Sequence, residues 1–231
     1  LNVKKTKWLF DQMTFEQLPT SPPLLEFHNG WWYYLGAANI SSQPQDGVPS
    51  NAHAFVRINQ DFSVLESIVL PTTAKNAYAY YVNGKTLYLV TQDKGAGGNP
   101  TFSIHKTTNL KDWEFYAKGP SMTGFSSMDD LVVTDKVIAV STGNGLWISN
   151  DQGASWKLQF EKKEISDVVI DTCGNLYTSI LQPATDMNYG GVFYSQNNGV
   201  SFSNLGKADN KVAIFDLEVD SLDNLLYAGT F

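Results

Sequence analysis

The sequence predicts an all-β domain built from one repeated unit of four strands. Aromatic residues make up 13% of the 231 residues and charged residues only 17%. The aromatic residues fall in short alternating runs, which is typical of strands and not of amphipathic helices. In addition, one turn motif recurs at intervals of little more than 40 residues, which is the spacing of a structural repeat. At 42% hydrophobic content, the chain can bury a substantial core.

The recurring turn is clearest at residues 149–156, where the sequence follows the pattern Ser-x-Asp-x-Gly-x-x-Trp from Ser149. The Asp151 carboxylate can accept hydrogen bonds from backbone N–H groups inside the turn, and Gly153 allows a positive φ. Trp156 can then bury its ring at the start of the next strand. We therefore expect a structural role for this motif.

Further copies of the turn set the period of the repeat. The copy at 195–202 has Asn197, Gly199 and Phe202 at its three key positions. Its aromatic residue lies 46 positions after that of the first turn (202 − 156 = 46). A shorter variant at 107–113 ends 43 positions before Trp156 of the first turn (156 − 113 = 43). More degenerate copies lie at 59–63 and 14–18.

A second motif precedes each turn and consists of an apolar strand, a tight turn and another strand. It is clearest in two segments, 167–177 and 216–227. Related segments occur at 130–140, 78–90 and 24–34. Each unit therefore holds four strands, a to d, with the Ser-x-Asp turn between strands c and d.

Complete units are expected at 22–70, 76–118, 128–163 and 165–206. The remaining segments, 212–231 and 1–20, hold strands a and b and strands c and d of one further unit. We therefore predict a single domain, 1–231, with the fold of a five-bladed β-propeller whose last blade is closed by N- and C-terminal strands. Such closure hides unpaired strand edges. The alternative is a piece of a propeller with six or more blades.

Two of the turns resemble motifs of known propeller families. The turn at 149–156 resembles the Asp-box, or BNR repeat, of sialidase-like β-propellers, and the variant at 107–113 resembles the Ser-x-Asp-Leu-x-x-Trp turn of five-bladed arabinanases and xylosidases. Sialidases bind a substrate carboxylate through an arginine cluster. Because Arg57 is the single arginine here, we do not expect a true sialidase. The five-bladed glycosidases use two aspartates and a glutamate, and the nearest glutamates, Glu26 and Glu164, lie in no recognisable signature.

The resemblance also implies which face carries the function. In propellers the b–c and d–a connections surround the mouth of the central channel, and the a–b and c–d turns lie on the opposite face. The b–c connections are short at 143–145 and long at 39–53, 92–101 and 182–191. Because long connections tend to carry binding residues, we expect a ligand site on this face.

Three aligned aspartates, Asp130, Asp167 and Asp216, open strand a of three blades and are candidate catalytic residues, with Asp129 beside the first. Carboxylates near one axis can act as acid and base in glycoside hydrolysis. They can also hold a Ca²⁺ ion near the channel mouth. The structural alternative is that each accepts hydrogen bonds from a neighbouring blade, and recurrence at one repeat position favours this alternative.

Neutral sugars are plausible ligands because aromatic faces stack on sugar rings while carboxylates and amides bind the hydroxyl groups. For each aromatic candidate, packing in the core is the competing interpretation. The three histidines show no metal-ligand spacing, so no metal site and no cofactor is predicted. The candidate ligand-binding residues are Asp129, Tyr78, Tyr80, Phe125, Tyr189 and His53.

Composition narrows the class of partner. A net charge of −7 argues against nucleic acid and anionic lipid as partners. Cys173 is the single cysteine, so an internal disulfide and a multi-cysteine metal site are excluded. No apolar run approaches 18 residues, so we expect no membrane insertion. Low charge and abundant Asn, Ser, Thr and Tyr favour a secreted, periplasmic or cell-surface protein, expected to be a monomer.

Together these observations predict an exported, non-catalytic propeller that binds a carbohydrate or another small neutral ligand on the face of the b–c loops. A glycoside hydrolase that uses paired aspartates is one alternative. A scaffold for protein interactions is the other, because a propeller fold by itself does not decide function.

Overall fold

The computed structural model of the chain describes residues 24–37, 53–71, 77–94, 99–122, 127–181, 191–206, 213–220, 222–223 and 225–230. All regular elements in these ranges are β-strands, which confirms the predicted all-β class. Within the same ranges, no helix is long and apolar enough to cross a membrane. The predicted strands at 1–20 lie outside the described residues.

The described strands form five antiparallel sheets, and each sheet uses strands that are consecutive in the chain. Sheet 1 contains β1 (Leu24–His28), β2 (Trp31–Ala37), β3 (His53–Asn59) and β4 (Leu65–Ser67). Sheet 2 contains β5 (Ala77–Asn83), β6 (Thr86–Lys94), β7 (Pro100–Thr107) and β8 (Glu114–Lys118). Sheet 3 contains β9 (Met128–Val133), β10 (Ile138–Thr142), β11 (Gly145–Ser149) and β12 (Lys157–Gln159).

Sheet 4 contains β13 (Glu164–Ile170), β14 (Leu176–Leu181), β15 (Gly191–Ser195) and β16 (Ser203–Gly206). In sheet 5 the described strands are β17 (Ile214–Asp220) and β18 (Leu225–Thr230). The four-strand period expected from the recurring turns is therefore present in the first four sheets.

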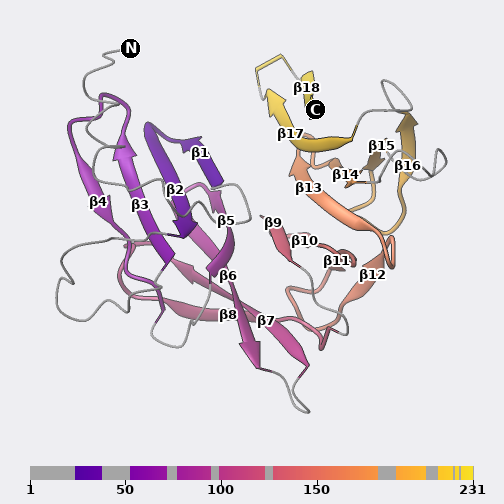
Figure 1. The fold of residues 1–231 in the computed structure, drawn as a ribbon, viewed down its shortest axis with the longest axis horizontal. Coiled ribbons are helices and arrows are strands. Elements are labelled where there is room, and N and C mark those ends of the chain that lie inside the picture. Colours follow the sequence, from indigo (N-terminus) through magenta and orange to yellow (C-terminus); the bar gives the residue numbers. More distant parts are fainter. Residues whose placement is uncertain are drawn as a thin grey trace.

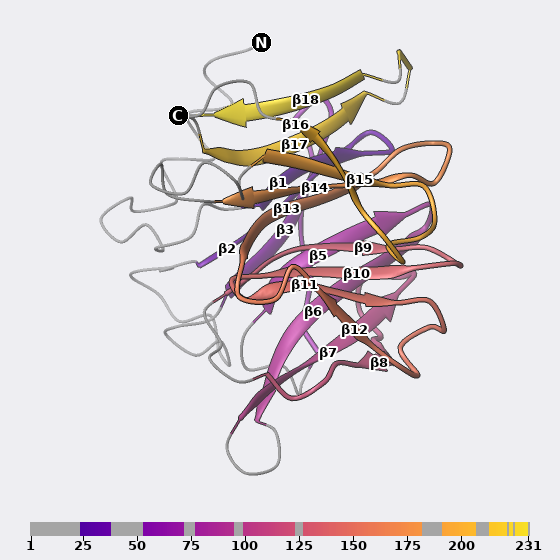
Figure 2. The ribbon, with the colours of Figure 1, turned by 90° about the vertical axis from the view of Figure 1, so that its right-hand side faces the viewer.

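The sheets follow one another around a ring in chain order (Figure 1). The first strand of each sheet lies nearest the centre of the ring, and β5, β9, β13 and β17 contact one another in sequence. This is the predicted five-bladed β-propeller architecture. Figure 2 shows that the a–b and c–d turns of sheets 3 and 4 project to the same side of the ring.

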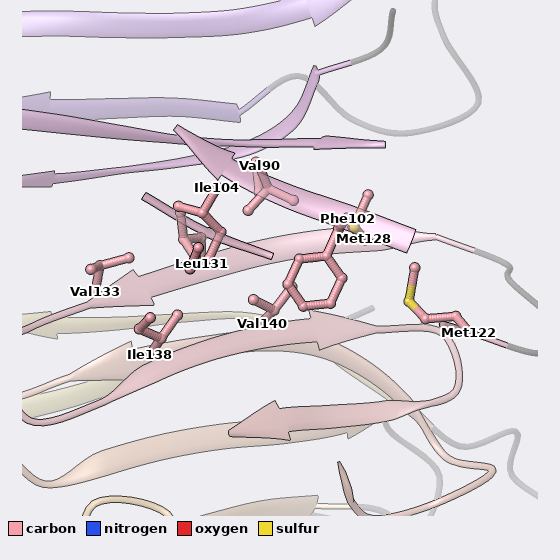
Figure 3. Packing of buried hydrophobic residues seen from close by; sticks show 11 residues of the cluster. Val90, Phe102, Ile104, Met122, Met128, Leu131, Val133, Ile138 and Val140 are labelled. Atoms are coloured by element: carbon pink, nitrogen blue, oxygen red, sulfur yellow. The ribbon is translucent and has the colours of Figure 1, made fainter. Parts of the chain in front are cut away.

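The core consists of apolar layers between successive sheets. Between sheets 2 and 3, Phe102, Ile104 and Leu131 are fully buried. Figure 3 shows side chains of this cluster meeting from strands of both sheets. Similar clusters fill the junctions between sheets 1 and 2, sheets 3 and 4, and sheets 4 and 5. Each sheet thus depends on its neighbours for burial of its apolar faces.

The turn at 149–156 is held by its own polar side chains. Gly153 N–H donates to Ser149 Oγ at 2.8 Å, and Ser155 N–H donates to Asp151 Oδ1 at 2.8 Å. Hydrogen bonds from the hydroxyl and backbone N–H of Ser155 keep the pKa of Asp151 below its usual range. Trp156 Nε1 donates to Lys118 O at 2.9 Å, which ties the turn to sheet 2.

The copy at 195–202 repeats this geometry. Gly199 N–H donates to Ser195 Oγ at 2.9 Å, and Ser201 N–H donates to Asn197 Oδ1 at 3.0 Å. Phe202 packs against Phe160, the residue after β12 of sheet 3, with ring centroids 5.1 Å apart. In both copies the motif bonds its own turn and packs its aromatic residue against the preceding sheet.

The tight packing of the first turn gives a test of this account. Gly153 has φ +89°, and a Cβ there would lie 2.4 Å from Ala117 Cβ, whereas Gly84 has φ +60° with open space around it. Gly153→Ala should combine about 1–2 kcal/mol of left-handed backbone strain with about 1–3 kcal/mol of overpacking.

The matched control, Gly84→Ala, should show the backbone cost alone, about 1–2 kcal/mol. Urea denaturation of both variants measures the difference. Equal destabilisation would mean that the turn does not pack tightly against sheet 2.

Candidate functional site

Two of the three aligned aspartates bind backbone groups of the next sheet. Asp130 and Asp167 are 9% and 7% exposed. Val168 N–H donates to Asp130 Oδ2 at 3.3 Å and to Asp167 Oδ1 at 2.7 Å, and Leu217 N–H donates to Asp167 Oδ2 at 2.5 Å. Because a first strand has no strand on its channel side, its N–H groups there need another acceptor. The aspartate of the preceding sheet supplies it.

The two buried carboxyl groups also affect each other's ionisation. Burial raises the pKa of Asp130 well above its usual range, and the adjacent Asp167 carboxylate raises it further. Burial likewise raises the pKa of Asp167, to about 6, although hydrogen bonds from Asp130 and Leu217 act in the opposite direction. The side-chain hydrogen bond between the pair requires a proton, so Asp130 is the group we assign as protonated.

Asp216 differs from its two counterparts because it is exposed on β17. Its charge is among the influences that raise the pKa of Asp167. The structure therefore brings Asp130 and Asp167 together as a buried pair and leaves Asp216 at the surface. The pair is therefore arranged as expected for a structural role of the aspartates, in which their carboxyl groups bind a neighbouring sheet.

A β-bulge precedes the aspartate position in four of the five first strands. In β5, β13 and β17 the register of pairing with the second strand of the sheet shifts at Tyr78, Ser166 and Phe215. Each of these residues directly precedes the position that aligns with Asp130. In β9, Asp129 and Asp130 lie together opposite Ser141. A bulge re-aims a side chain locally. These positions carry Tyr78, Asp129, Ser166 and Phe215, a different side chain in each blade.

Asp129 is the acidic residue among these four side chains. Ser127 Oγ donates to Asp129 Oδ2 at 2.7 Å. Burial raises the pKa of Asp129 to about 6, the Ser127 hydrogen bond lowers it and the charge of Glu164 raises it. Gly143 N–H donates to Ser127 O at 3.2 Å. Asp129 thus lies beside the short b–c turn of sheet 3.

The other bulge residues provide complementary chemistry. Tyr78 is half-buried, and its hydroxyl donates to Gln92 Oε1 at 2.8 Å. Ser166 Oγ donates to Ile214 O at 2.8 Å. Phe215 is 39% exposed. The bulges of neighbouring strands therefore present a phenol, a carboxyl group, a hydroxyl group and a phenyl ring at the same level of the ring.

The remaining candidates from the sequence lie elsewhere. Tyr80 is fully buried between sheets 1 and 2 and donates to Tyr33 O at 2.9 Å. Phe125 and Tyr189 lie outside the described residues, as do most residues of the three long b–c connections and the side chain of His53. Among the described residues, no group of three or more His, Cys, Asp or Glu is arranged to hold a metal ion. The alternative in which the aspartates hold a Ca²⁺ ion near the channel mouth therefore gains no support from the described residues.

Sequence reasoning missed three residues of the candidate site, Ser166, Phe215 and Gln92. Ser166 follows the apolar residue at the start of a strand and has no motif around it. The bulge sets the position of the Ser166 side chain. Because the bulge depends on pairing with β14, the sequence around Ser166 does not reveal it. Comparing the residue before each aligned aspartate would have drawn attention to Ser166, Asp129 and Phe215.

No family model matches the sequence, and no curated protein matches it significantly. Solved structures do match. PorZ, a surface component of the type IX secretion system of Porphyromonas gingivalis, is similar at a TM-score of 0.55 with 9% identity, over 97% of this chain and 39% of PorZ. A puromycin-hydrolysing peptidase of Mycobacterium tuberculosis is similar at 0.52 with 10% identity, over 91% of this chain and 38% of the peptidase.

A xylosidase and arabinofuranosidase of family GH43 from a compost metagenome is similar at a TM-score of 0.47 with 12% identity, over 94% of this chain and 87% of the enzyme. Identities this low show the fold alone. In six of the matching structures, the peptidase and PorZ included, the chain spans 33% to 57% of the matched protein. The chain has a β-propeller fold, which glycoside hydrolases and bacterial surface proteins share.

The buried aspartate pair makes stability depend on pH. A carboxyl group whose pKa is raised on folding holds its proton more tightly in the folded state, so stability falls as pH rises through the folded pKa. We expect the free energy of unfolding to fall from about pH 4 through pH 6 and beyond, because the pKa of Asp167 rises to about 6 and that of Asp130 rises higher.

Asp130→Asn places an amide where the protonated carboxyl group lies. The free energy of unfolding of this variant should therefore decrease less with rising pH. Denaturant titrations at pH 5, 6, 7 and 8 measure the slope, and Asp135→Asn, in the exposed β9–β10 turn, is the control. An Asp130→Asn slope that equals the slope of the parent protein would contradict the shared-proton assignment.

Proposed function

We propose that the protein is an exported, monomeric β-propeller that binds a carbohydrate or another small neutral polar ligand on the face where the first strands begin. The observation that carries this proposal is the recurring bulge. It gives neighbouring blades different side chains at one level, among them Tyr78 and Asp129, while the aspartate that follows binds the next sheet.

The side chains at the bulges suit a ligand with hydroxyl groups and apolar C–H surfaces. The Asp129 carboxyl group and the Gln92 amide can exchange hydrogen bonds with hydroxyl groups. An aromatic face such as that of Phe215, which is 39% exposed, can stack on a sugar ring. A net charge of −7 disfavours an anionic ligand. A neutral polyol is therefore the ligand class that we favour.

The proposal is tested by screening the pure protein on a glycan array and measuring the best ligand by calorimetry. Asp129→Asn should weaken binding roughly tenfold, about 1.4 kcal/mol, because it replaces a charge-assisted hydrogen bond. Asp135→Asn, in the exposed β9–β10 turn beyond the other end of β9, should leave binding unchanged.

Equal losses in the two variants would point to a general effect on the fold. No binding to any glycan or neutral small polyol would contradict the proposal and favour the protein-interaction scaffold.

One observation favours glycoside hydrolysis as a second candidate function. Burial places the pKa of Asp129 at about 6, and Glu164 is close enough to contribute to that shift. A raised carboxyl pKa beside a second carboxylate is the division of roles that glycosidases use. In this account Asp129 is the acid and Glu164 the partner base or nucleophile.

Hydrolysis of aryl glycosides tests this second function. If the protein is a hydrolase, Asp129→Asn should lower kcat at least about 100-fold, while Asp130→Asn, which alters the buried pair, should retain activity at permissive temperature. Binding without hydrolysis in the parent protein would exclude the enzyme and leave the lectin-like function.

A further inference from the structure

One face of sheet 2 is polar over the half that lies toward its b–c connection. In β6 and β7, Asp93 pairs with Thr101, and Thr91 pairs with Ser103. Directly paired residues, and residues two positions apart along a strand, share one face of a sheet. The next pair on this face contains Leu89, which belongs to the apolar cluster between sheets 1 and 2. The four polar side chains therefore face the junction with sheet 1.

Three hydroxyl groups on this face are buried. Thr91, Thr101 and Ser103 are 0%, 5% and 5% exposed. Thr91 Oγ1 donates to Ser103 O at 3.4 Å, and Ser103 Oγ donates to a carboxylate oxygen of Asp93. Thr101 Oγ1 differs, because it is buried and has no hydrogen-bond partner among the described residues. A buried hydroxyl group without a protein partner is normally satisfied by a bound water molecule or ion.

The carboxylate of Asp93 has no basic partner on this face. No ion pair joins it to a lysine or arginine in the described part of the chain. Lys118 pairs with Ser103 but is exposed to solvent. Arg57, on β3 of sheet 1, forms its ion pair with Glu66 at 2.6 Å. The negative charge of Asp93, which is partly buried, is therefore left without a compensating side chain.

His105 does not supply the missing positive charge. Its ring lies on the same face as Ser103, two residues further along β7, and the residue is 8% exposed. Burial lowers the pKa of His105, and the charge of Asp93 offsets this only in part. The imidazole is therefore neutral at pH 7.

The donor atoms on this face suit a cation with a single charge. Ser103 Oγ keeps its lone pairs while it donates its proton to Asp93, so it can bind a cation at the same time. Hydroxyl and carboxylate oxygens are hard ligands, which bind hard cations. Buried charges need a partner, and one positive charge neutralises one carboxylate. The Thr101 hydroxyl is too deeply buried for a sugar ring to reach it.

We propose that Asp93, Thr101 and Ser103 bind a monovalent alkali cation, Na⁺ or K⁺, in the junction between sheets 1 and 2. The ion accepts lone pairs from the carboxylate and the two hydroxyl groups, and water completes its coordination. This site is separate from the proposed ligand site. The Gln92 amide of that site lies on the opposite face of sheet 2, because Gln92 pairs with Phe102 of the cluster between sheets 2 and 3.

Thermal unfolding in matched salts tests the proposal without any sugar ligand. The protein is unfolded in NaCl, in KCl and in tetramethylammonium chloride, each at about 0.15 M ionic strength. Tetramethylammonium is too large to enter a buried site and serves as the reference. An ion that binds only the folded chain stabilises it, so at least one alkali salt should raise the Tm by about 2–6 °C.

Two variants and a matched control assign the rise to this site. Thr101→Val should be at least as stable as the parent in the reference salt, because it removes a buried hydroxyl group without a partner, but it should lose more than half of the rise. Asp93→Asn should abolish the rise. Ser141→Ala removes the corresponding unpartnered hydroxyl group in sheet 3 and should keep the rise in full.

Three results would overturn the proposal. An equal Tm in all three salts would leave the Thr101 hydroxyl group to a bound water molecule. A rise that Thr101→Val and Asp93→Asn keep in full would place the ion elsewhere. A larger rise in CaCl₂ at the same ionic strength would contradict the match between one carboxylate and one positive charge.

Sodium NMR of the parent protein keeps the proposal testable if the variants fail to fold. The sodium signal should broaden when the protein is added, because bound Na⁺ tumbles with the chain, and added K⁺ should reverse the broadening by competition. A sodium signal that the protein does not change, together with no Tm rise in KCl, would again overturn the proposal.

Discussion

The hydrogen bond between a carboxyl group and a backbone N–H of the next sheet is the interaction on which this propeller depends. The first strand of each blade has one edge paired with the second strand and one edge toward the channel. N–H groups on the channel edge cost free energy if they are buried without a partner. Asp130 and Asp167 supply acceptors for Val168 and Leu217, and each bond also fixes the position of one blade relative to the next.

That role explains why the aspartate recurs while the residue before it varies. A structural requirement repeats from blade to blade, and the bond that meets it is present between sheets 3 and 4 and between sheets 4 and 5. A ligand is not symmetric about the ring axis, so a binding face needs different groups on different blades. In the proposed binding face these groups are Tyr78, Asp129, Ser166 and Phe215, which the bulges place at one level of the ring.

Burying Asp130 and Asp167 side by side makes it costly in free energy for both to be charged. Two carboxyl groups in one apolar junction cannot both ionise, so one keeps its proton and stability becomes dependent on pH. The benefit is a pair of acceptors that fits N–H groups from two sheets. Asp216, at the same repeat position, stays exposed in the described part of the chain.

Much of the fold could be predicted from the sequence because its signals are local. Ser149, Asp151 and Gly153 form their turn by bonding one another, so the pattern identifies the hairpin and its spacing gives the blade count. The site was less accessible, because the bulge that positions Asp129 and Ser166 is created by pairing with a neighbouring strand. The sequence aligned Asp130, Asp167 and Asp216 correctly, but burial, which no local pattern encodes, separates the first two from the third.

An NMR titration of the aspartate side-chain carboxyl carbons, recorded together with the backbone amide signals, tests the central interaction most directly. The account predicts that Asp130 and Asp167 titrate as a coupled pair above the ordinary aspartate range, and that the amide signals of Val168 and Leu217 shift with them. Ordinary titration of both carboxyl groups near about pH 4, with amide signals that do not respond, would contradict it.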